Sequence, residues 1–179
     1  MSHNELSERH LVLVGLMGAG KTTVGQRCAE LLDRAFLDTD ELLVAAAGIP
    51  FDVLWAAEGE PGFRARERVA VADAVASPQL LVISCGGGTV LDPDNRRSLR
   101  ARGVVVWLEA PSAALASRLA DDDTRPLLAG GDRTATLERI RSLREPAYAA
   151  AAHLRVDTEG LTVDEVAEHV VEEFRSWNG

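Results

Sequence analysis

The sequence predicts a single α/β domain in which a parallel β-sheet is covered by helices on both faces. Two observations lead to this class. Apolar runs of four or five residues, several rich in valine, recur along the chain and are too short for buried helices. Between them lie stretches whose apolar residues have helical spacing, and this alternation is typical of parallel sheets. We expect strands at 11–14, 35–38, 80–84, 104–108 and 153–156.

The clearest helical stretches follow the same alternation, and Thr162 with Glu165 forms a capping box at the start of the last one. Residues 40–84 hold two or three helices and no convincing strand before the third one, so they resemble an inserted substrate-binding lobe. The stretch 120–135 is rich in Asp, Gly and Arg and predicts a mobile surface loop. We expect helices at 22–32, 93–101, 112–119 and 162–177.

Composition narrows the class of protein. A chain of 179 residues with 46% apolar and 26% charged residues fits one soluble domain. Its formal charge of −9 argues against binding to nucleic acid or anionic lipid, so any anionic ligand must meet a local basic cluster. Cys28 and Cys85 have no metal-site or redox spacing and are interpreted as reduced core thiols.

The N-terminal ten residues are polar and lack the basic start and apolar run of a secretion signal. Nowhere do about 18 apolar residues run together, so no membrane-spanning helix is expected. These two features predict a cytoplasmic protein.

The segment Gly15–Thr22 carries the most specific motif, because it matches GxxxxGK[ST] and lies between a predicted strand and a predicted helix. Its glycines let backbone N–H groups turn toward phosphates at the positive end of the helix dipole. Lys21 is expected to reach the β- and γ-phosphates, and the Thr22 hydroxyl to bind Mg²⁺. A glycine turn that binds nothing would not need the Lys-Thr pair, so we predict ATP or GTP binding.

Asp38 and Asp40 end the second strand, at the sheet edge where open α/β sheets bind ligands. In extended backbone a two-residue spacing points both carboxylates the same way. One could hold a water of Mg²⁺ while the other accepts a hydrogen bond from an attacking hydroxyl. Either residue could instead only cap the following helix, and local sequence leaves both interpretations open.

The triplet Gly86–Gly88 follows the third strand at the same edge. One or two glycines would fit a plain turn. Three in succession favour a wall that a ligand approaches closely, because no side chain stands in the way.

Three arginines are candidates for binding an anionic acceptor in this acidic chain. Arg64 and Glu67 lie three residues apart on one helical face, so Glu67 could aim Arg64, although such pairs are commonly solvated. Arg125, within the predicted mobile loop, could close over phosphates or simply lie on the surface. Arg144 precedes the fifth strand and has no obvious helical partner.

Along nearly its whole length, from Leu11 to Val156, the chain resembles the shikimate kinases. A phosphate loop alone marks a very large superfamily, whereas five further motifs in this order and spacing are specific. The matching segments are 15–25, Asp38-Thr-Asp40, 59–67, Gly86–Gly88, Arg125-Pro-Leu-Leu128 and Arg144-Glu-Pro-Ala-Tyr148.

The resemblance implies a P-loop NTPase fold like that of nucleoside monophosphate kinases, with sheet order 2-3-1-4-5, a helical substrate-binding lobe and a lid. It implies ATP-dependent phosphorylation of the shikimate 3-hydroxyl, in the route to chorismate and aromatic amino acids. Residues 1–179 would form one kinase domain and act as a monomer. Its parts would be the core (11–38, 80–119 and 136–179), the lobe (about 39–79) and the lid (about 120–135).

The resemblance also implies roles for individual residues. Asp40 would bind the acceptor hydroxyls and orient or deprotonate the nucleophile, with Lys21 and Arg125 as the other catalytic groups. Arg64, Arg144 and the glycine triplet would bind shikimate, while Thr22 and Asp38 would support Mg²⁺. ATP would contact Gly18, Ala19, Gly20, Lys21, Thr22, Thr23, Arg118 and Arg125.

Three alternatives remain at this point. A kinase of gluconate or of nucleoside monophosphates would share the ATP machinery but would not need the acceptor set. A kinase of a cyclitol related to shikimate would need few changes. A silent nucleotide-binding module would be expected to lose Lys21, Thr22 or Asp40, and all three are present. The acidic run Asp121–Asp123 has no physical explanation, and the loop 158–161 matches the family weakly.

Overall fold

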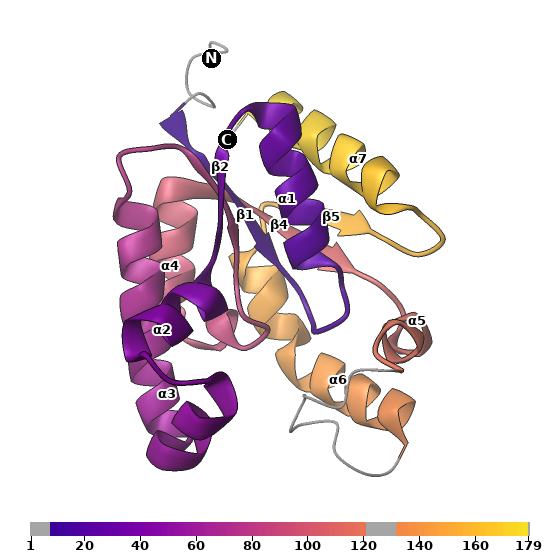
Figure 1. Ribbon diagram of the computed structural model, residues 1–179. Coiled ribbons are helices and arrows are strands. Elements are labelled where there is room, and N and C mark those ends of the chain that lie inside the picture. Colours follow the sequence, from indigo (N-terminus) through magenta and orange to yellow (C-terminus); the bar gives the residue numbers. More distant parts are fainter. Residues whose placement is uncertain (1–7, 121–131, 179) are drawn as a thin grey trace.

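The computed structural model describes residues 8–120 and 132–178, which form a five-stranded parallel sheet between two layers of helices (Figure 1). The strand order is β2-β3-β1-β4-β5, as the family resemblance implied. All four strand pairings are parallel. The strands are β1 (His10–Val14), β2 (Ala35–Asp38), β3 (Leu81–Ser84), β4 (Gly103–Glu109) and β5 (Leu154–Asp157).

The central strands carry continuous apolar runs because helices cover both of their faces. Every residue of β1 and β3 is buried, as is every residue of β4 except Glu109. The outer strands β2 and β5 are partly exposed. All five predicted strands are confirmed to within one residue at each end.

Helices α1 and α7 pack together on one face of the sheet, while α3, α4 and α6 lie on the other (Figure 1). The four predicted helices are confirmed to within one residue, and the capping box of Thr162 and Glu165 is present. The helices are α1 (Lys21–Leu32), α2 (Thr39–Ala47), α3 (Phe51–Ala76), η2 (Thr89–Leu91, a 3₁₀ turn), α4 (Pro93–Arg102), α5 (Ser112–Arg118), α6 (Arg133–Ala151) and α7 (Val163–Ser176).

The loop predicted to run from 120 to 135 ends earlier than expected, because α6 begins at Arg133. Asp132 caps it, and its Oδ1 accepts a hydrogen bond from the Ala135 N–H at 3.1 Å. The first turn of α6 is polar and Leu137 is its first buried residue, which explains why apolar spacing did not reveal the start of the helix. Residues 121–131, most of the predicted lid, lie outside the described residues.

Helices α2 and α3 form a lobe that extends past the carboxyl ends of the strands (Figure 1). α3 is broken at Gly59, whose φ of 63° is not helical. The lobe has a small apolar cluster of its own, made of Leu43, Leu54, Phe63 and Ala70. Among the described residues, no single helix is long and apolar enough to cross a membrane; α2 and α3, bent by 96°, pass that test only as a pair.

The two cysteines are the core thiols that the sequence predicts. Both are free and buried, Cys28 on α1 and Cys85 just after β3. Burial raises the pKa of the Cys28 thiol to about 12. The pKa of Cys85 is raised as well, first by burial and then by the nearby carboxylates of Glu67 and Asp40. Both side chains therefore remain protonated at neutral pH and act as small apolar groups.

Two histidines lie near the amino ends of the strands, and each uses a ring nitrogen as a hydrogen-bond acceptor. His10 Nδ1 accepts from the Leu81 N–H at 3.1 Å. His153 Nδ1 accepts from the Val105 N–H at 2.9 Å. Burial, followed by the charges of Arg100 and Arg9, lowers the pKa of His153 to about 4, and burial also lowers that of His10. The fold therefore needs both rings neutral.

These histidines predict acid sensitivity. Because the folded pKa of His153 lies below the ordinary value of 6.5, the unfolded chain binds more protons between pH 6.5 and about 4. The free energy of unfolding thus falls as the pH is lowered through this window. In His153→Asn the amide oxygen can accept the Val105 hydrogen bond without titrating. Calorimetry should show a fall in Tm between pH 7 and pH 4.5 that is smaller than in the parent by on the order of 5 °C.

The matched control is His169→Asn, because His169 is an exposed residue of α7. Its ring lies 3.8 Å from a Glu173 oxygen in an exposed ion pair, and such pairs contribute little, so this variant should change the pH dependence of Tm much less than His153→Asn does. Equal falls in Tm for the parent and His153→Asn would show that the neutral ring of His153 does not contribute to acid sensitivity.

Candidate active site

The phosphate loop joins β1 to α1 at the carboxyl edge of the sheet. Gly15, Gly18 and Gly20 have φ values of 151°, 80° and 85°, a region that favours glycine. Gly20 is the N-cap of α1 and has no side chain with which to cap the first turn. The backbone N–H groups of that turn therefore face a ligand position at the positive end of the helix dipole.

Lys21 lies across this loop. Its Nζ donates to the carbonyl oxygens of Gly15 and Leu16 at 2.9 and 3.0 Å. These bonds hold the ammonium beside the first turn of α1, where phosphates bind in loops of this shape. A phosphate there would accept hydrogen bonds from the same ammonium.

Asp38 makes the helix cap that was one of the two interpretations of the sequence, and its other oxygen contacts the phosphate-loop side of the cleft. Its Oδ1 caps α2 by accepting from the Asp40 N–H at 2.9 Å. Its Oδ2 accepts from the Thr22 hydroxyl at 3.1 Å, across the carboxyl edge of the sheet. The expectation that Asp38 and Asp40 share extended backbone is wrong, because Asp40 lies in the first turn of α2. Both nevertheless line the same cleft.

The Thr22 and Asp38 oxygens fit a Mg²⁺ site of the kind found in phosphoryl-transfer enzymes. Mg²⁺ is commonly held by one or two protein oxygens, with water and substrate phosphates completing its shell. A hydroxyl and a carboxylate 3.1 Å apart beside the phosphate loop match that requirement. Residues 8–120 and 132–178 contain no cluster of three or more acidic, His or Cys side chains that would hold a metal alone.

The glycine triplet after β3 lies directly against acidic and basic side chains. The Gly86 N–H donates to Thr39 Oγ1 at 3.2 Å, and a Cβ placed on Gly86 would lie 2.5 Å from Asp40 Oδ1. A Cβ on Gly88 would overlap the guanidinium of Arg64. The backbone is therefore a wall that Asp40 and Arg64 can approach only because both positions are glycine.

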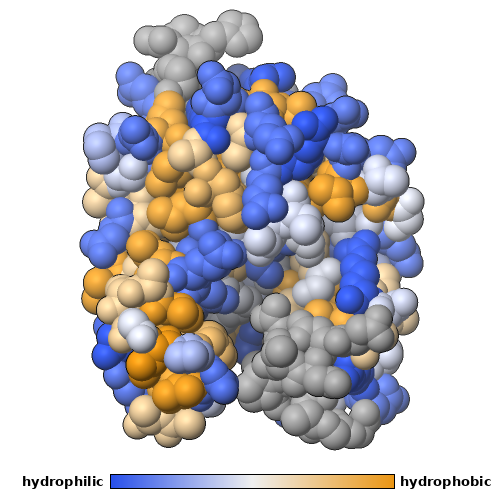
Figure 2. Space-filling model, in the orientation of Figure 1, coloured by the Kyte–Doolittle hydropathy of each residue, from blue (hydrophilic) through white to orange (hydrophobic). Residues whose placement is uncertain are grey.

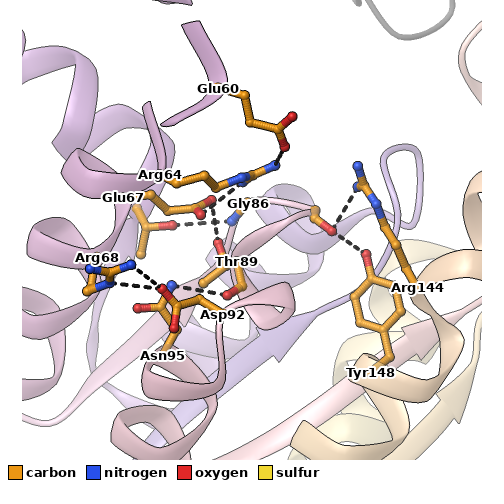
Figure 3. A network of polar contacts seen from close by, with 12 residues as sticks. Glu60, Arg64, Glu67, Arg68, Gly86, Thr89, Asp92, Asn95, Arg144 and Tyr148 are labelled. Carbon is orange, nitrogen blue, oxygen red and sulfur yellow. Dashed lines mark hydrogen bonds and ion pairs between the residues drawn. The ribbon is translucent and has the colours of Figure 1, made fainter. Parts of the chain in front are cut away.

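Arg64 is held in place from below, and its predicted pairing with Glu67 is confirmed (Figure 3). Its Nη1 donates to Glu67 Oε2 at 2.9 Å. Glu67 is only 1% exposed, and its other oxygen accepts from the Thr89 hydroxyl at 2.9 Å. Because a buried carboxylate without partners would be costly, this arrangement fixes the guanidinium beside Gly88.

Arg144 reaches the triplet from the opposite side, on α6 (Figure 3). Its Nη1 donates to the Gly87 carbonyl oxygen at 3.0 Å. The Tyr148 hydroxyl donates to the same oxygen at 2.6 Å. Two guanidinium groups, from α3 and α6, thus flank one short stretch of backbone.

Arg118, at the end of α5, connects the phosphate loop to the loop after β5. It donates to the Gly18 carbonyl oxygen at 3.3 Å and to the hydroxyl and carbonyl oxygens of Thr158 at 3.0 and 2.8 Å. Thr158 is 2% exposed. The segment that matched the family weakly therefore contributes to the position of this guanidinium.

Most of these groups line one cleft of about 1240 Å³, which is large enough for a nucleotide and a small acceptor. Figure 2 shows a hollow near the middle of the molecule, beside the apolar surface over α2 and α3. Its polar and glycine lining contains Gly18, Gly20, Lys21, Thr22, Thr23, Asp38, Asp40, Arg64, Glu67, Gly86, Gly87, Gly88, Arg118 and Arg144.

Comparisons with known proteins match this chain to one family. A family model described as "Shikimate kinase" matches residues 17–175. A shikimate kinase of Dechloromonas aromatica is 42% identical over 166 residues, which cover 93% of this chain and 90% of that protein. The chain belongs to the shikimate kinase family. With its phosphate loop, this membership makes it an ATP-dependent kinase.

Solved structures separate this family from its neighbours. A shikimate kinase from Acinetobacter baumannii, in complex with shikimate, has a TM-score of 0.88 at 34% identity, and the match covers 96% of each chain. A gluconokinase from Sinorhizobium meliloti 1021 has a TM-score of 0.64 at 20% identity over 94% of this chain and 92% of that one, so it shares the fold alone. The P-loop kinase fold is thus common to both, and the similarity in sequence lies with the shikimate kinases.

Two of the predicted site residues, Ala19 and Arg125, are not among the described residues that line the cleft. Ala19 belongs to the phosphate loop, but its side chain is 2% exposed and its N–H donates to the Leu16 carbonyl oxygen at 3.2 Å. Its side chain packs in the core, and its N–H stabilises the turn of the phosphate loop in this kinase. Arg125, the predicted lid arginine, lies outside the described residues, as does the acidic run Asp121–Asp123.

Glu67 was expected to position Arg64, but the sequence did not indicate the other residues that position the arginines of this shikimate kinase family member. Each of these other residues acts through a single hydroxyl and lies far from its partner in the sequence. They are Thr89, Tyr148 and Thr158. Tyr148 was visible as part of the motif that begins at Arg144, but nothing in the local sequence indicated what its hydroxyl would contact.

The contact between Gly88 and Arg64 predicts the effect of one added methyl group. Gly88→Ala would displace the Arg64 guanidinium and leave the buried Glu67 carboxylate without its cation. We expect urea unfolding to show a loss of roughly 1–3 kcal/mol. Gly87→Ala is the matched control, because its Cβ would meet nothing closer than 3.6 Å and its stability should change by less than about 1 kcal/mol. Equal stabilities of the two variants would contradict the proposed overlap.

Proposed function

We propose that the protein transfers the γ-phosphoryl group of ATP to the 3-hydroxyl of shikimate, forming shikimate 3-phosphate and ADP. The observation that carries this proposal is the convergence of Asp40, Arg64 and Arg144 on the glycine triplet, opposite the phosphate loop of the same cleft. A relative of this fold binds shikimate, as the Acinetobacter structure is described. The product would belong to the route toward chorismate and the aromatic amino acids.

The nucleotide would bind at residues 18–23, with its phosphates against the first turn of α1. Backbone N–H groups there and the Lys21 ammonium would hold the β- and γ-phosphates. Thr23 is tied back to the loop, since its hydroxyl donates to the Gly20 carbonyl oxygen at 3.1 Å. Arg118 would lie against the adenine ring, because a planar guanidinium stacks well on aromatic faces.

Mg²⁺ would be held by the Thr22 hydroxyl directly and by Asp38 through water. The bound ion would neutralise charge that develops on the phosphates. The oxygens of Thr22 and Asp38 support this assignment because they already lie within hydrogen-bonding distance of each other beside Lys21. The cap that Asp38 makes to α2 would keep its carboxylate oriented while it does so.

The acceptor carboxylate would lie between Arg64 and Arg144. A chain with a formal charge of −9 needs such a local pair of cations to bind a small anion near ATP. Guanidinium groups suit carboxylates because they donate two parallel hydrogen bonds. The Gly86–Gly88 backbone would line the ring of the acceptor, since a side chain at Gly86 or Gly88 would displace Asp40 or Arg64.

Asp40 would orient the attacking hydroxyl and accept its proton. Phosphoryl transfer depends mainly on positioning and on neutralising charge, so a single well-placed carboxylate is sufficient for this step. Asp40 lies in the first turn of α2 with its carboxylate beside Gly86, and it lines the same cleft as Lys21, which supports the role.

The remaining parts of the proposal concern the division of the domain, the oligomeric state and the location of the protein. Residues 39–79 would form the substrate-binding lobe and residues 120–135 the lid, with Arg125 arriving on the phosphates when the lid closes. The other segments, 11–38, 80–119 and 136–179, would make up the core of one kinase domain. We propose a monomer, since the described residues of one chain supply both the phosphate loop and the acceptor-binding groups. The use of ATP, an intracellular metabolite, supports a cytoplasmic location.

An assay of ADP release tests the proposed function. With ATP and Mg²⁺, the purified protein should release ADP when shikimate is added, and EDTA should abolish the reaction. Quinate, gluconate and nucleoside monophosphates serve as competing acceptors. Turnover on one of these with none on shikimate would overturn the assignment of the acceptor, while the ATP site would stand.

The role of Asp40 can be separated from ATP binding. Asp40→Asn removes the proton acceptor and should lower kcat by roughly 10²–10⁴-fold, while the Kd for ATP stays within about twofold. Asp52→Asn is the matched control, because Asp52 lines the same cleft from α3 and should keep nearly full activity. A variant at Asp40 that lost ATP binding but kept its turnover per bound ATP would place Asp40 on the wrong ligand.

A further inference from the structure

The Gly87 carbonyl oxygen is the point where α6 contacts the glycine triplet, through Arg144 and Tyr148. Figure 3 shows these two side chains on the same helix. The oxygen accepts two hydrogen bonds, from Tyr148 at 2.6 Å and from Arg144 at 3.0 Å. A carbonyl oxygen has two lone pairs, so these two donors use its full capacity. The short distance to Tyr148 makes the hydroxyl the closer of the two supports for this backbone.

The ring of Tyr148 is fixed on its far side. It stacks on Trp107 of β4, with ring centroids 5.4 Å apart and an interplanar angle of 19°. The guanidinium of Arg155 lies 4.3 Å from the centre of the Trp107 ring. Arg155 in turn pairs with Glu109, which also accepts from Arg141 of α6 at 3.2 Å. The phenol ring is therefore packed on β4, and its partner Trp107 is in turn contacted by Arg155 of β5.

The hydroxyl is a donor at all neutral pH values. Tyr148 is 1% exposed, and burial raises the pKa of its phenol to about 12. Arg144, one turn earlier on α6, counteracts this shift only in part. A buried hydroxyl that stays protonated at neutral pH and lies 2.6 Å from a carbonyl oxygen is suited to holding that carbonyl in a fixed place.

Gly87 also lies next to the phosphate loop. A Cβ at this position would stand 3.6 Å from the Gly15 carbonyl oxygen and 3.7 Å from the Met17 nitrogen. The same Gly15 oxygen accepts from Lys21 at 2.9 Å. Movement of Gly87 would therefore change the distance between the acceptor wall and the loop that holds ATP.

We propose that Tyr148 is a positioning residue for the acceptor: by holding the Gly87 carbonyl, its hydroxyl sets where the glycine wall and the Arg144 guanidinium meet the acceptor carboxylate. This inference rests on the proposed function. The competing interpretation is that Tyr148 only fills space against Trp107, in which case its ring is needed but its hydroxyl is not.

Tyr148→Phe separates the two interpretations, because the ring and its stacking on Trp107 stay while one hydrogen bond is lost. We expect the KM and the calorimetric Kd for shikimate to rise by about tenfold, the amount that one hydrogen bond contributes. The Kd for ATP should stay within about twofold, and kcat should fall less than shikimate binding does. An unchanged Kd for shikimate would overturn the inference.

Two controls exclude a general loss of stability and test the route through Arg144. Val170→Ala truncates a fully buried side chain of α7, and it should lower Tm while leaving the KM for shikimate unchanged. Shikimate methyl ester lacks the carboxylate charge, so Tyr148→Phe should weaken its binding by much less than tenfold. An equal loss for acid and ester would overturn the route through Arg144.

A spectroscopic measurement needs no substitution, because Tyr148 is the one tyrosine in the chain. Labelling with ¹³Cζ-tyrosine gives a single resonance whose shift reports on the hydrogen bond of the hydroxyl. This resonance should have the shift of a phenol that donates a strong hydrogen bond, and the shift of a hydroxyl without a partner would overturn the inference. Parent protein that binds no shikimate at all would overturn the proposed function, and this inference with it.

Discussion

The parallel pairing of β1 with β3 is the constraint on which the rest of the site depends. It continues past the strands, where the Cys85 N–H donates to the Leu13 carbonyl oxygen at 3.0 Å. Both strands then end at the same edge, and each is followed by a glycine-rich segment. The phosphate loop and the glycine triplet therefore lie side by side without any direct hydrogen bond having to bring them together. Nucleotide and acceptor sites become neighbours through the sheet itself.

The charged side chains at that edge of the sheet are oriented by their hydrogen-bond partners. The protein is acidic as a whole, yet Arg64 and Arg144 both line the cleft, and each is hydrogen-bonded to a defined partner. Glu67 is the partner of Arg64, and the Gly87 carbonyl is shared between Arg144 and Tyr148. An anion that enters the cleft meets guanidinium groups whose orientation is already set. Such preorganisation lowers the entropy that binding would otherwise cost.

The sequence predicts those parts of the structure that depend on local pattern. The strands were predicted to within one residue because buried parallel strands are continuous apolar runs. The phosphate loop was predicted because its functional residues are consecutive in the sequence. The start of α6 was missed because its first turn is polar. A cap was one of the two interpretations of Asp38 and Asp40, but local sequence did not show that the chain turns into α2 at Thr39, so Asp40 was placed in extended backbone.

The positioning residues escaped prediction for a different reason, which is distance along the chain. Tyr148 contacts a residue 61 positions away, Arg118 is held by Thr158 at 40 positions, and Thr89 meets Glu67 at 22. No periodicity or spacing rule connects such pairs, since only the tertiary fold brings them together. The family resemblance pointed to the arginines but was silent on what orients them.

The bare backbone at Gly86 and Gly88 has a consequence for inhibition and drug resistance. Resistance to an inhibitor commonly arises when a side chain that contacts it is exchanged for another. Here a compound that bound to the triplet would touch main-chain atoms, which substitution does not change. Any side chain introduced at Gly86 or Gly88 would displace Asp40 or Arg64 before it reached the compound. This stretch of the cleft is therefore a surface where escape by point mutation would damage the protein itself.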